Sequence, residues 1–479
     1  MYSERGLFID GAWRRMGGAG NNPVLDPATG EPLGNTPMAS TDDTHEAIEA
    51  ASRAFVSWSV TPAWTRADIL HKVADAMLTH ADEAARTMTL ETGKPLAQSR
   101  REWQLSIDQF RWYAEEARRI YGRIVESRAP GGRIEVTHEP VGVVAAFTAW
   151  NFPAVLIARK VAPALAAGCT VVVRPSNEVP GVAMAIFACL QEAGIPAGVA
   201  NLVVGATGDT YRILMASPVV RKVSLTGSTE VGQQMIRDAA ATMKRVSMEL
   251  GGNAPMIVFD DADLERTLDL AVPTKYANAG QVCVAPDRFY VHESLYKTFS
   301  EGFAARAKAL KVGSGLDEAT QMGPLINKRR RDAIEAVVEE ARSTGGKVVA
   351  GGSRPVDRNA GFFFQPTVIT GLPDDAKALA DENFGPIAAI TPFKSDDEVY
   401  GRANDSVYGL SAYAFTRSPA RAREAVARIQ SGMVGINSFA LAAAEAPFGG
   451  TKYSGMGREG GIEGIADYSN VKLGQVALP

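Results

Sequence analysis

The chain alternates short apolar runs with amphipathic stretches from residue 141 onward. Residues 143–147 form an apolar run, and further segments of strand length lie at 170–173, 202–204 and 222–225. Segments with the apolar spacing of helices separate them, including residues 155–167 and the segment that Pro180 opens and Gly194 ends. Because strands without a polar face are typical of parallel sheets covered on both sides, the pattern predicts a doubly wound α/β domain.

A second alternating set begins at residue 254 and predicts a second α/β domain. We expect helices at 327–342 and 419–430, and strands at 256–259, 288–292, 347–350, 387–392, 411–415 and 433–436. The segment before residue 122 is helical in pattern, with a long amphipathic helix at 103–121 and an earlier helix whose apolar face carries Ile48, Ala51, Phe55 and Trp58.

Two segments lie outside this alternation. Residues 124–138 form two extended runs around Pro130-Gly131-Gly132, which indicates either an exposed hairpin or a plain surface loop. The strand-like tail at 468–478 has no partner within its own stretch, so we expect it to pair with this hairpin, with the hairpin of a second subunit as one option.

Composition narrows the class of protein. The 479 residues carry 50 Lys plus Arg and 54 Asp plus Glu, a net charge of −4 that gives no electrostatic case for nucleic acid. The apolar run at 161–173 contains Pro163 and is shorter than the about 20 residues that span a bilayer, so no membrane association is expected. The N-terminus, with Glu4 and Arg5, lacks the pattern of a signal peptide. We expect a cytoplasmic protein.

Cysteine and histidine usage agrees with that location. The three cysteines, Cys169, Cys189 and Cys283, do not suggest a disulfide framework and favour a reducing compartment. The five histidines are scattered singly, without the spacing of zinc ligands, so no metal site is expected.

A glycine-containing turn follows the predicted strand at 222–225. Gly227 permits close approach of a ligand, Ser228 offers a hydroxyl, and the backbone N–H groups of the next helix suit a phosphate. The spacing differs from the G-x-G-x-x-G fingerprint, and a capped helix start explains it equally.

Three residues are candidates for covalent chemistry. Cys283 follows small residues in a loop able to expose a thiol, although most cysteines are buried structural thiols. Glu249 lies between apolar neighbours, where desolvation raises its pKa toward that of a general base; a salt-bridged or solvated Glu is the alternative. Asn151 follows a predicted buried strand, where its amide either donates to an oxyanion or caps the next helix.

The ordered motifs resemble the NAD(P)-dependent aldehyde dehydrogenase superfamily over essentially the whole chain, nearest to its succinate-semialdehyde and α-ketoglutarate-semialdehyde branch. The motifs are Trp150-Asn151-Phe152-Pro153, Gly227-Ser228-Thr229, Glu249-Leu250-Gly251-Gly252, Gly280-Gln281-Val282-Cys283, Glu382-Asn383-Phe384-Gly385-Pro386, Pro447-Phe448-Gly449-Gly450 and Ser454-Gly455. The resemblance implies a Rossmann-type cofactor domain (1–122 and 141–248), an α/β catalytic domain (249–450) and a small β oligomerisation element (123–140 and 451–479). It also implies a homodimer or homotetramer.

The resemblance further implies residue roles. Cys283 is the nucleophile, Asn151 and the Cys283 backbone N–H hold the oxyanion, and Glu249 activates the water that hydrolyses the thioester. NAD or NADP is the implied cofactor, bound by Trp150, Arg174, Ser176, Asn177, Gly227, Ser228, Gly232, Leu250, Glu382 and Phe384. Asn177 stands where NAD-preferring members often carry Glu, which favours tolerance of a 2′-phosphate, whereas the adjacent Glu178 opposes it.

The substrate implied by the branch is an ω-carboxy semialdehyde whose carboxylate meets Arg159. The channel is expected to include Phe152, Val155, Leu156 and Phe448. An Arg159 paired with a protein carboxylate is the alternative, and Ala277 and Ala443 replace polar residues of the branch, which favours uncharged aliphatic or aromatic aldehydes. CoA-acylating relatives typically lack the base that Glu249 supplies, and a non-catalytic protein on the same fold would have lost catalytic residues.

Overall fold

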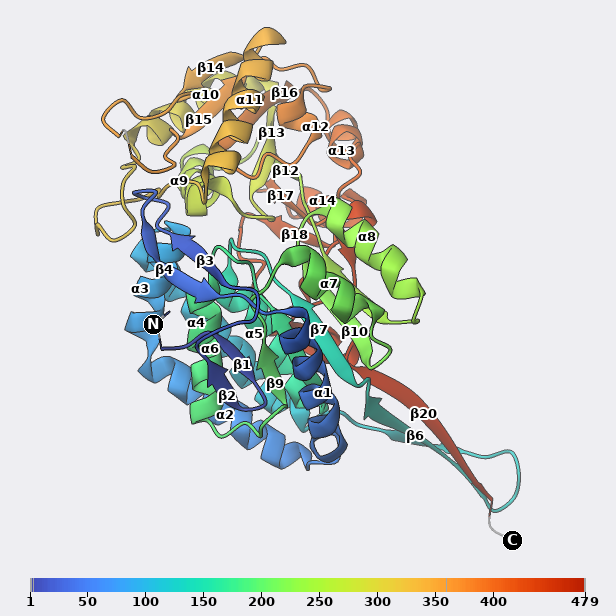
Figure 1. Ribbon diagram of the computed structural model, residues 1–479. Coiled ribbons are helices and arrows are strands. Elements are labelled where there is room, and N and C mark those ends of the chain that lie inside the picture. The colour runs from blue at the N-terminus through green and yellow to red at the C-terminus, as the bar shows by residue number, and fades with distance from the viewer. Residues whose placement is uncertain (1, 3, 359, 478–479) are drawn as a thin grey trace.

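The computed structural model describes residues 2, 4–358 and 360–477, which form two large sheets with helices on both faces and a projecting arm (Figure 1). In the described chain the first sheet has eight strands, of which β11 through β9 run parallel and β19, β1 and β2 are antiparallel additions at the edges. In spatial order they are β19 (Gly455–Met456), β11 (Arg245–Glu249), β10 (Val220–Thr226), β7 (Val143–Phe147), β8 (Thr170–Arg174), β9 (Ala200–Leu202), β1 (Leu7–Ile9) and β2 (Ala12–Arg14).

Alternate residues of the central strands enter two separate cores. Val144 and Ala146 face one cluster with α2, α4, α5 and α6, while Val143 and Ala145 face another with α1, α7 and α8. The helices are α1 (Thr41–Trp58), α2 (Ala63–Thr79), α3 (Ala81–Thr92), α4 (Leu96–Ala117), α5 (Pro153–Ala167), α6 (Pro180–Glu192), α7 (Thr207–Ala216) and α8 (Thr229–Ala240). The predicted doubly wound domain is confirmed, with burial of both strand faces as its cause.

The second sheet has seven strands in the described chain, all parallel except β14. In spatial order they are β14 (Lys347–Ala350), β15 (Thr367–Thr370), β16 (Ile387–Phe393), β13 (Pro286–His292), β12 (Ala254–Val258), β17 (Ser411–Phe415) and β18 (Met433–Ile436). Its helices are α9 (Leu264–Tyr276), α10 (Glu293–Ala309), α11 (Lys328–Ser343), α12 (Lys377–Ala380), α13 (Asp396–Asn404) and α14 (Pro419–Arg428).

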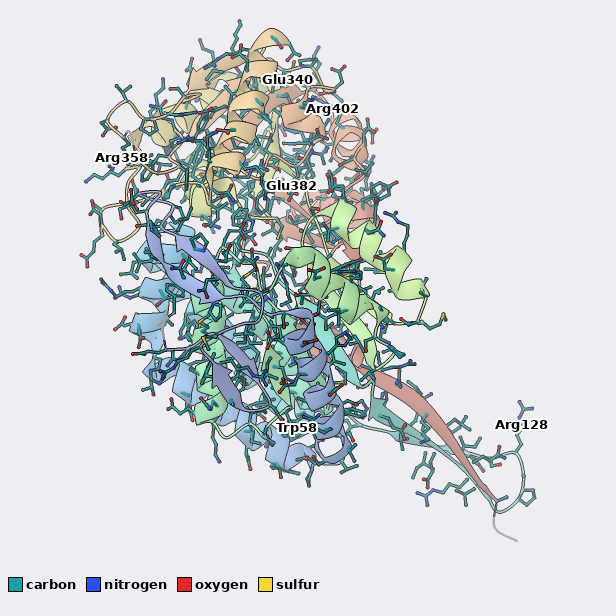
Figure 2. All side chains as sticks on the ribbon, in the orientation of Figure 1. Trp58, Arg128, Glu340, Arg358, Glu382 and Arg402 are labelled. Carbon is teal, nitrogen blue, oxygen red and sulfur yellow. The ribbon has the colours of Figure 1, made fainter. Side chains whose placement is uncertain are left out.

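The predicted hairpin is present and forms the arm. β5 (Arg123–Glu126) pairs with β6 (Gly132–Pro140), and β6 pairs along its length with β20 (Ser469–Ala477). The tail therefore pairs with the hairpin of its own chain; Leu478 lies outside the described residues. Arg128 lies near the tip of this arm (Figure 2).

Other segments differ from the sequence pattern. The long helix begins at Leu96, directly after Pro95, and ends at Ala117. Within the segment assigned to the tail, β19 joins the first sheet and α15 (Gly461–Ala466) packs on α4 and α5. The short strands β3 (Asn21–Leu25), β4 (Pro32–Pro37), β11 and β15 escaped prediction because they are brief or polar and rely on distant partners. No helix of the described residues is long and apolar enough to cross a bilayer.

Candidate active site

A cavity of about 520 Å³ lies at the carboxyl ends of β7, β10 and β11. Ligands of open α/β sheets bind at this edge. The lining brings together most of the residues singled out in the sequence: Trp150, Asn151, Gly227, Ser228, Leu250, Cys283, Glu382 and Phe384. Ile326, Asn327, Arg329, Arg330 and Ala333 from the start of α11 close the other side, a wall that the sequence did not predict.

Cys283 follows a sharply bent loop. Asn278, Ala279 and Gly280 all have positive φ, at 48°, 54° and 73°. A side chain at Gly280 would place its Cβ 2.1 Å from the carbonyl oxygen of Gly385, so only glycine fits there. Cys283 is partly exposed and lines the cavity, whereas Cys169 and Cys189 are buried, which separates the three cysteines as the sequence predicts.

The surroundings of Cys283 disfavour its thiolate. The pKa of the Cys283 thiol is raised to about 12, chiefly by burial and to a smaller extent by the carboxylates of Glu382 and Glu249, whereas Arg159 lowers it. The thiol is therefore protonated at neutral pH in the cofactor-free protein, and nucleophilic attack requires removal of its proton.

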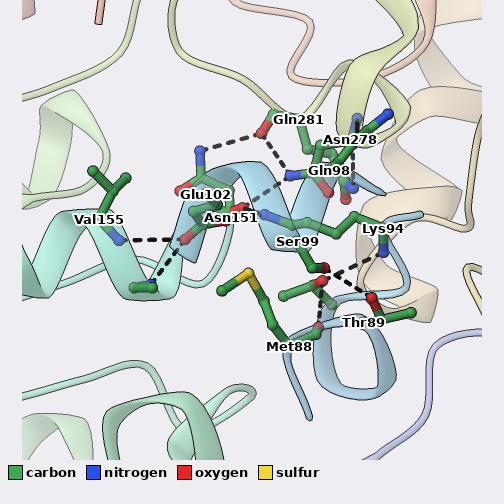
Figure 3. Close-up of polar contacts among 12 residues, drawn as sticks. Met88, Thr89, Lys94, Gln98, Ser99, Glu102, Asn151, Val155, Asn278 and Gln281 are labelled. Atoms are coloured by element: carbon green, nitrogen blue, oxygen red, sulfur yellow. Dashed lines mark hydrogen bonds and ion pairs between the residues drawn. The ribbon is translucent and has the colours of Figure 1, made fainter. Parts of the chain in front are cut away.

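Asn151 directs its side chain toward the loop that carries Cys283. Its Nδ2 donates to the carbonyl oxygen of Gln281 at 3.2 Å, and its own carbonyl oxygen accepts from Lys94 Nζ at 2.7 Å and Asn278 Nδ2 at 3.0 Å (Figure 3). Asn151 Oδ1 is buried and has no hydrogen-bond partner. The predicted alternative, a helix cap, does not occur, because α5 has no side-chain cap from its own N-terminal residue.

Glu249 is the last residue of β11 and is buried. Among the described residues its Oε2 has no hydrogen-bond partner and no salt bridge neutralises it, so the alternative of a salt-bridged or solvated Glu is wrong. Burial raises the pKa of Glu249 well above its ordinary value, the Glu459 carboxylate raises it further, and Lys160 lowers it. A Cβ at Gly449 would lie 2.7 Å from Glu249 Oε1, so glycine leaves the space that this carboxylate occupies.

Lys160 and Glu459 form a buried ion pair beside Glu249 that sequence reasoning missed. Lys160 Nζ also donates to Thr226 Oγ1 at 2.7 Å. The signal that identifies Lys160 is a second cation, next to Arg159, in the otherwise apolar α5. No comparable signal marks Glu459, which lies 299 residues further along the chain.

The predicted cofactor residues occupy two places. In the cavity, the rings of Trp150 and Phe384 meet edge to face at 5.4 Å, and Glu382 accepts a hydrogen bond from the Gly252 N–H at 3.0 Å. Burial raises the pKa of Glu382 to about 8. Ser228 caps α8 by accepting from Val231 N–H at 3.4 Å.

Arg174, Ser176 and Asn177 lie beyond that lining, at the carboxyl end of the neighbouring strand β8. Arg174 donates to Thr207 Oγ1 at 2.7 Å and to Asn177 Oδ1 at 3.1 Å. Gly232 packs against Leu250: a Cβ at Gly232 would lie 2.5 Å from the Leu250 side chain. In the structure Gly232 allows α8 to pack closely on the end of β11, whereas we expected from the sequence that it contacts the cofactor.

Arg159 and Phe448 mark the far side of Cys283. Arg159 is 3 % exposed, its guanidinium carbon lies 4.1 Å from the ring centre of Phe448, and its Nε has no hydrogen-bond partner among the described residues. Phe448 belongs to a small apolar cluster against which Cys283 packs. The buried ion pairs of the described chain are Lys94–Glu102, Lys160–Glu459 and Lys275–Asp287, so Arg159 is not paired with a protein carboxylate in the way the alternative required.

Val155 and Leu156 precede Arg159 on α5 and are buried. Phe152 directly follows Asn151, and its ring centre lies 4.2 Å from Lys94 Nζ.

Cys283, which lines the cavity, thus lies with a buried carboxylate and a side-chain amide at the ligand-binding edge of a doubly wound sheet, an arrangement suited to an enzyme that uses a cysteine nucleophile. The model of the aldehyde dehydrogenase family matches residues 13–473, and the chain belongs to this family. The protein is an NAD(P)-dependent oxidoreductase that acts on aldehydes.

Similar proteins match this chain over nearly its full length, in sequence and in structure. The glutarate-semialdehyde dehydrogenase of Pseudomonas putida is 42% identical over 465 residues, covering 97% of this chain and 96% of the relative. The succinate-semialdehyde dehydrogenase (NADP+) GabD of Escherichia coli is 42% identical over 471 residues, covering 98% and 97%. The crystal structure of succinate-semialdehyde dehydrogenase from Burkholderia pseudomallei superposes with a TM-score of 0.96 at 41% identity, covering 99% of this chain and 98% of that one.

Proposed function

We propose that the protein oxidises an ω-carboxy semialdehyde, such as succinate semialdehyde, to the dicarboxylic acid. Arg159 carries this proposal, because its buried guanidinium has an unpartnered Nε and lies across Phe448 from Cys283. A buried cation without a counter-ion is costly, and a substrate carboxylate would offset that cost. The semialdehydes named for the similar enzymes carry such a carboxylate.

Uncharged aliphatic or aromatic aldehydes are the second candidate. Leu441 and Ala442 pack against the apolar cluster of Phe448 and Cys283, and Ala443 adds no polar group to this rim. An apolar rim favours a substrate without a charge at its far end.

The proposed chemistry begins when the Cys283 thiol gives its proton to solvent water and the sulfur attacks the aldehyde carbon. The carbonyl oxygen becomes an oxyanion, held by the Cys283 backbone N–H and by the Asn151 N–H that Gln281 does not use. NAD(P)+, which Trp150, Leu250 and Phe384 would hold, would supply the acceptor for the hydride of the substrate carbon. Cys283 is then acylated, and Glu249 takes a proton from the water that attacks the thioester, which releases the acid and returns the thiol.

Lys160 and Glu459 set the pKa of Glu249 for the hydrolysis step. A general base near neutral pH needs a pKa above that of a solvated glutamate, and burial with Glu459 supplies the increase. Lys160 limits it, so that Glu249 can still ionise.

We assign the dinucleotide to the cavity and to the adjoining end of β8. Gly227, Ser228 and the start of α8 suit the diphosphate, Trp150, Leu250 and Phe384 suit the nicotinamide side, and Glu382 suits a ribose. Arg174, Ser176 and Asn177 suit the second ribose, and Gly232 allows α8 to approach. Arg174 Nε is buried and has no hydrogen-bond partner among the described residues, and Ser176 Oγ donates a hydrogen bond to the Glu178 carboxylate. A free Arg174 donor and an occupied Glu178 carboxylate support tolerance of a 2′-phosphate.

We further propose a cytoplasmic homodimer or homotetramer that contacts its copies through the arm. Val471 and Leu473 of β20 and Ile124 of β5 are exposed apolar residues on this element. Residues 1–122 and 141–248 are assigned as the cofactor domain, 249–450 as the catalytic domain, and 123–140 with 451–479 as the oligomerisation element.

A panel of aldehydes tests the proposal. Succinate semialdehyde, butanal and benzaldehyde are each supplied with NAD+ or NADP+, without CoA, and acid formation is measured. The proposal expects the highest kcat/KM with succinate semialdehyde and acid as the product. A preference for butanal or benzaldehyde would favour the second candidate, and a requirement for CoA would contradict hydrolysis by Glu249.

A further inference from the structure

Lys94 is a buried lysine at the turn between α3 and α4, outside the lining of the cavity. Its ammonium lies 2.5 Å from Glu102 Oε2 and 2.7 Å from the carbonyl oxygen of Asn151 (Figure 3). It also lies 4.2 Å from the ring centre of Phe152. Two of its three N–H donors therefore have acceptors, one of them on the main chain of Asn151.

Glu102 extends this contact to the helix that follows Asn151. Its Oε1 accepts from Ala154 N–H at 2.8 Å and Val155 N–H at 3.4 Å, the first free donors of α5. A carboxylate at a helix N-terminus is favourable, and this one is supplied from α4. The ion pair thus fixes the main chain on both sides of Phe152.

The loop of Cys283 is held by the same elements. Asn278 Nδ2 donates to the Asn151 carbonyl oxygen that Lys94 also contacts, and the Asn278 N–H donates to Gln98 Oε1 of α4 at 2.9 Å. Asn278 opens the run of positive φ before Cys283, a conformation that persists only where its surroundings impose it.

A buried ion pair is a weak source of stability, since well-packed apolar residues of similar size often replace one without loss. This ion pair instead holds two loops in place, because the Lys94 ammonium and the Glu102 carboxylate fix the loop of Asn151 against the loop of Cys283.

We propose that Lys94, paired with Glu102, is a positioning residue that sets the main chain of Asn151 so that its side-chain amide faces the reacting carbon at Cys283. The proposal rests on the proposed oxyanion role of Asn151. Lys94 acts through Asn151 and touches no reacting atom, so its loss should weaken the transition state more than the binding of cofactor or aldehyde.

Lys94→Met tests this, with Lys244→Met as the matched control. Lys244 is also a buried lysine that donates to main-chain carbonyls, those of Ser217 and Val220, remote from the cavity lining. We expect Lys94→Met to lower kcat by about 10- to 100-fold with KM and the Kd for NAD(P)+ changed by less than about threefold. Lys244→Met should lower the midpoint of urea unfolding and leave kcat within about twofold.

A double-variant cycle adds a readout that a purely structural role would not move. If Lys94 acts through Asn151, Lys94→Met combined with Asn151→Ala should be no slower than Asn151→Ala alone. Losses that multiply, or a Lys94→Met enzyme with wild-type kcat per folded active site, would overturn the proposal. Should Lys94→Met not fold, Glu102→Gln, which keeps an acceptor for α5, must lower kcat several-fold with KM unchanged; wild-type kcat there would overturn it equally.

The roles of Asn151 and Lys94 can be distinguished by comparing their variants. If Asn151→Ala itself retains full activity, the proposed role of Asn151 is wrong. If Asn151→Ala is slow and Lys94→Met is not, only the positioning role of Lys94 is wrong.

Discussion

The side-chain amide of Asn151 donates a hydrogen bond to the carbonyl oxygen of Gln281 at 3.2 Å, in the loop that leads to Cys283. A primary amide has two N–H donors, so this bond fixes the amide plane and leaves one donor for the substrate. We expect Asn151→Ala to lower kcat by about 10²- to 10³-fold, as loss of one oxyanion donor does elsewhere. Steady-state kinetics with saturating NAD(P)+ measure it.

Asn151→Asp is the matched control, because it preserves the size of the side chain and removes its N–H donors. It should be as slow as Asn151→Ala. A variant of either kind that keeps kcat within about threefold of wild type would exclude the amide as the principal oxyanion donor.

The pKa of the Cys283 thiol, raised by burial to about 12, predicts the pH dependence of its alkylation. Only the thiolate reacts, so the cofactor-free enzyme should react with iodoacetamide at a rate that rises roughly tenfold per pH unit, without a plateau up to about pH 10. Mass spectrometry of the peptide containing Cys283 distinguishes this reaction from alkylation of the buried Cys169 and Cys189.

Glu249→Gln supplies the control for that experiment. The Glu249 carboxylate raises the pKa of Cys283, so its removal should speed alkylation at a given pH. A plateau near neutral pH in the wild-type enzyme would show that the thiol is already ionised and would contradict this electrostatic account.

Arg159→Met separates a charged from an uncharged substrate. Methionine keeps an unbranched apolar stem beside Phe448 and removes the guanidinium. Loss of a buried charge partner costs about 2–5 kcal/mol, so kcat/KM for succinate semialdehyde should fall at least roughly 30-fold. Butanal, which has the same chain length without the carboxylate, should keep kcat/KM within about threefold; equal losses for both aldehydes would contradict recognition of a carboxylate.

Lys160→Met should shift the pH dependence of acyl-enzyme hydrolysis. The Lys160 ammonium lowers the pKa of Glu249 and the Glu459 carboxylate raises it. Removing Lys160 deletes the first effect and leaves Glu459 without its ion-pair partner, so the pKa of Glu249 rises. Because a base acts only when ionised, the acid limb of the single-turnover hydrolysis rate should move to higher pH.

Lys160→Arg keeps the positive charge and should leave that limb closer to the wild-type position. An acid limb that stays in place in Lys160→Met, or moves to lower pH, would show that Lys160 does not act on the base.

The sequence predicted those parts of the fold that depend on local pattern. β7 and β8 are almost entirely apolar on both faces, so their runs stand out in the sequence. The residues at the carboxyl ends of β7 and β10 lie together in the lining of the cavity, as expected. β11 carries Arg245 and Ser247 and gives no such run; its place depends on pairing with β10 and β19.

Site residues that lie in a local motif could be predicted from the sequence. Residues whose role depends on a partner far along the chain could not. Cys283, Glu249 and Asn151 each lie in a local motif. Lys160 pairs with a residue 299 positions away, and Lys94 contacts Asn151 across 57 positions. Only the folded chain brings such buried charges together, and no periodicity along the sequence records them.

Single-turnover acylation of Glu249→Gln tests the central claim most directly, that Cys283 forms a thioester which Glu249-activated water hydrolyses. With succinate semialdehyde and NAD(P)+, this variant should release about one equivalent of NAD(P)H per active site and then stop. The mass of the peptide containing Cys283 should increase by the succinyl group, and Cys283→Ala should show neither the burst nor the added mass. Continued wild-type turnover by Glu249→Gln, or a burst without acylation of Cys283, would contradict the account.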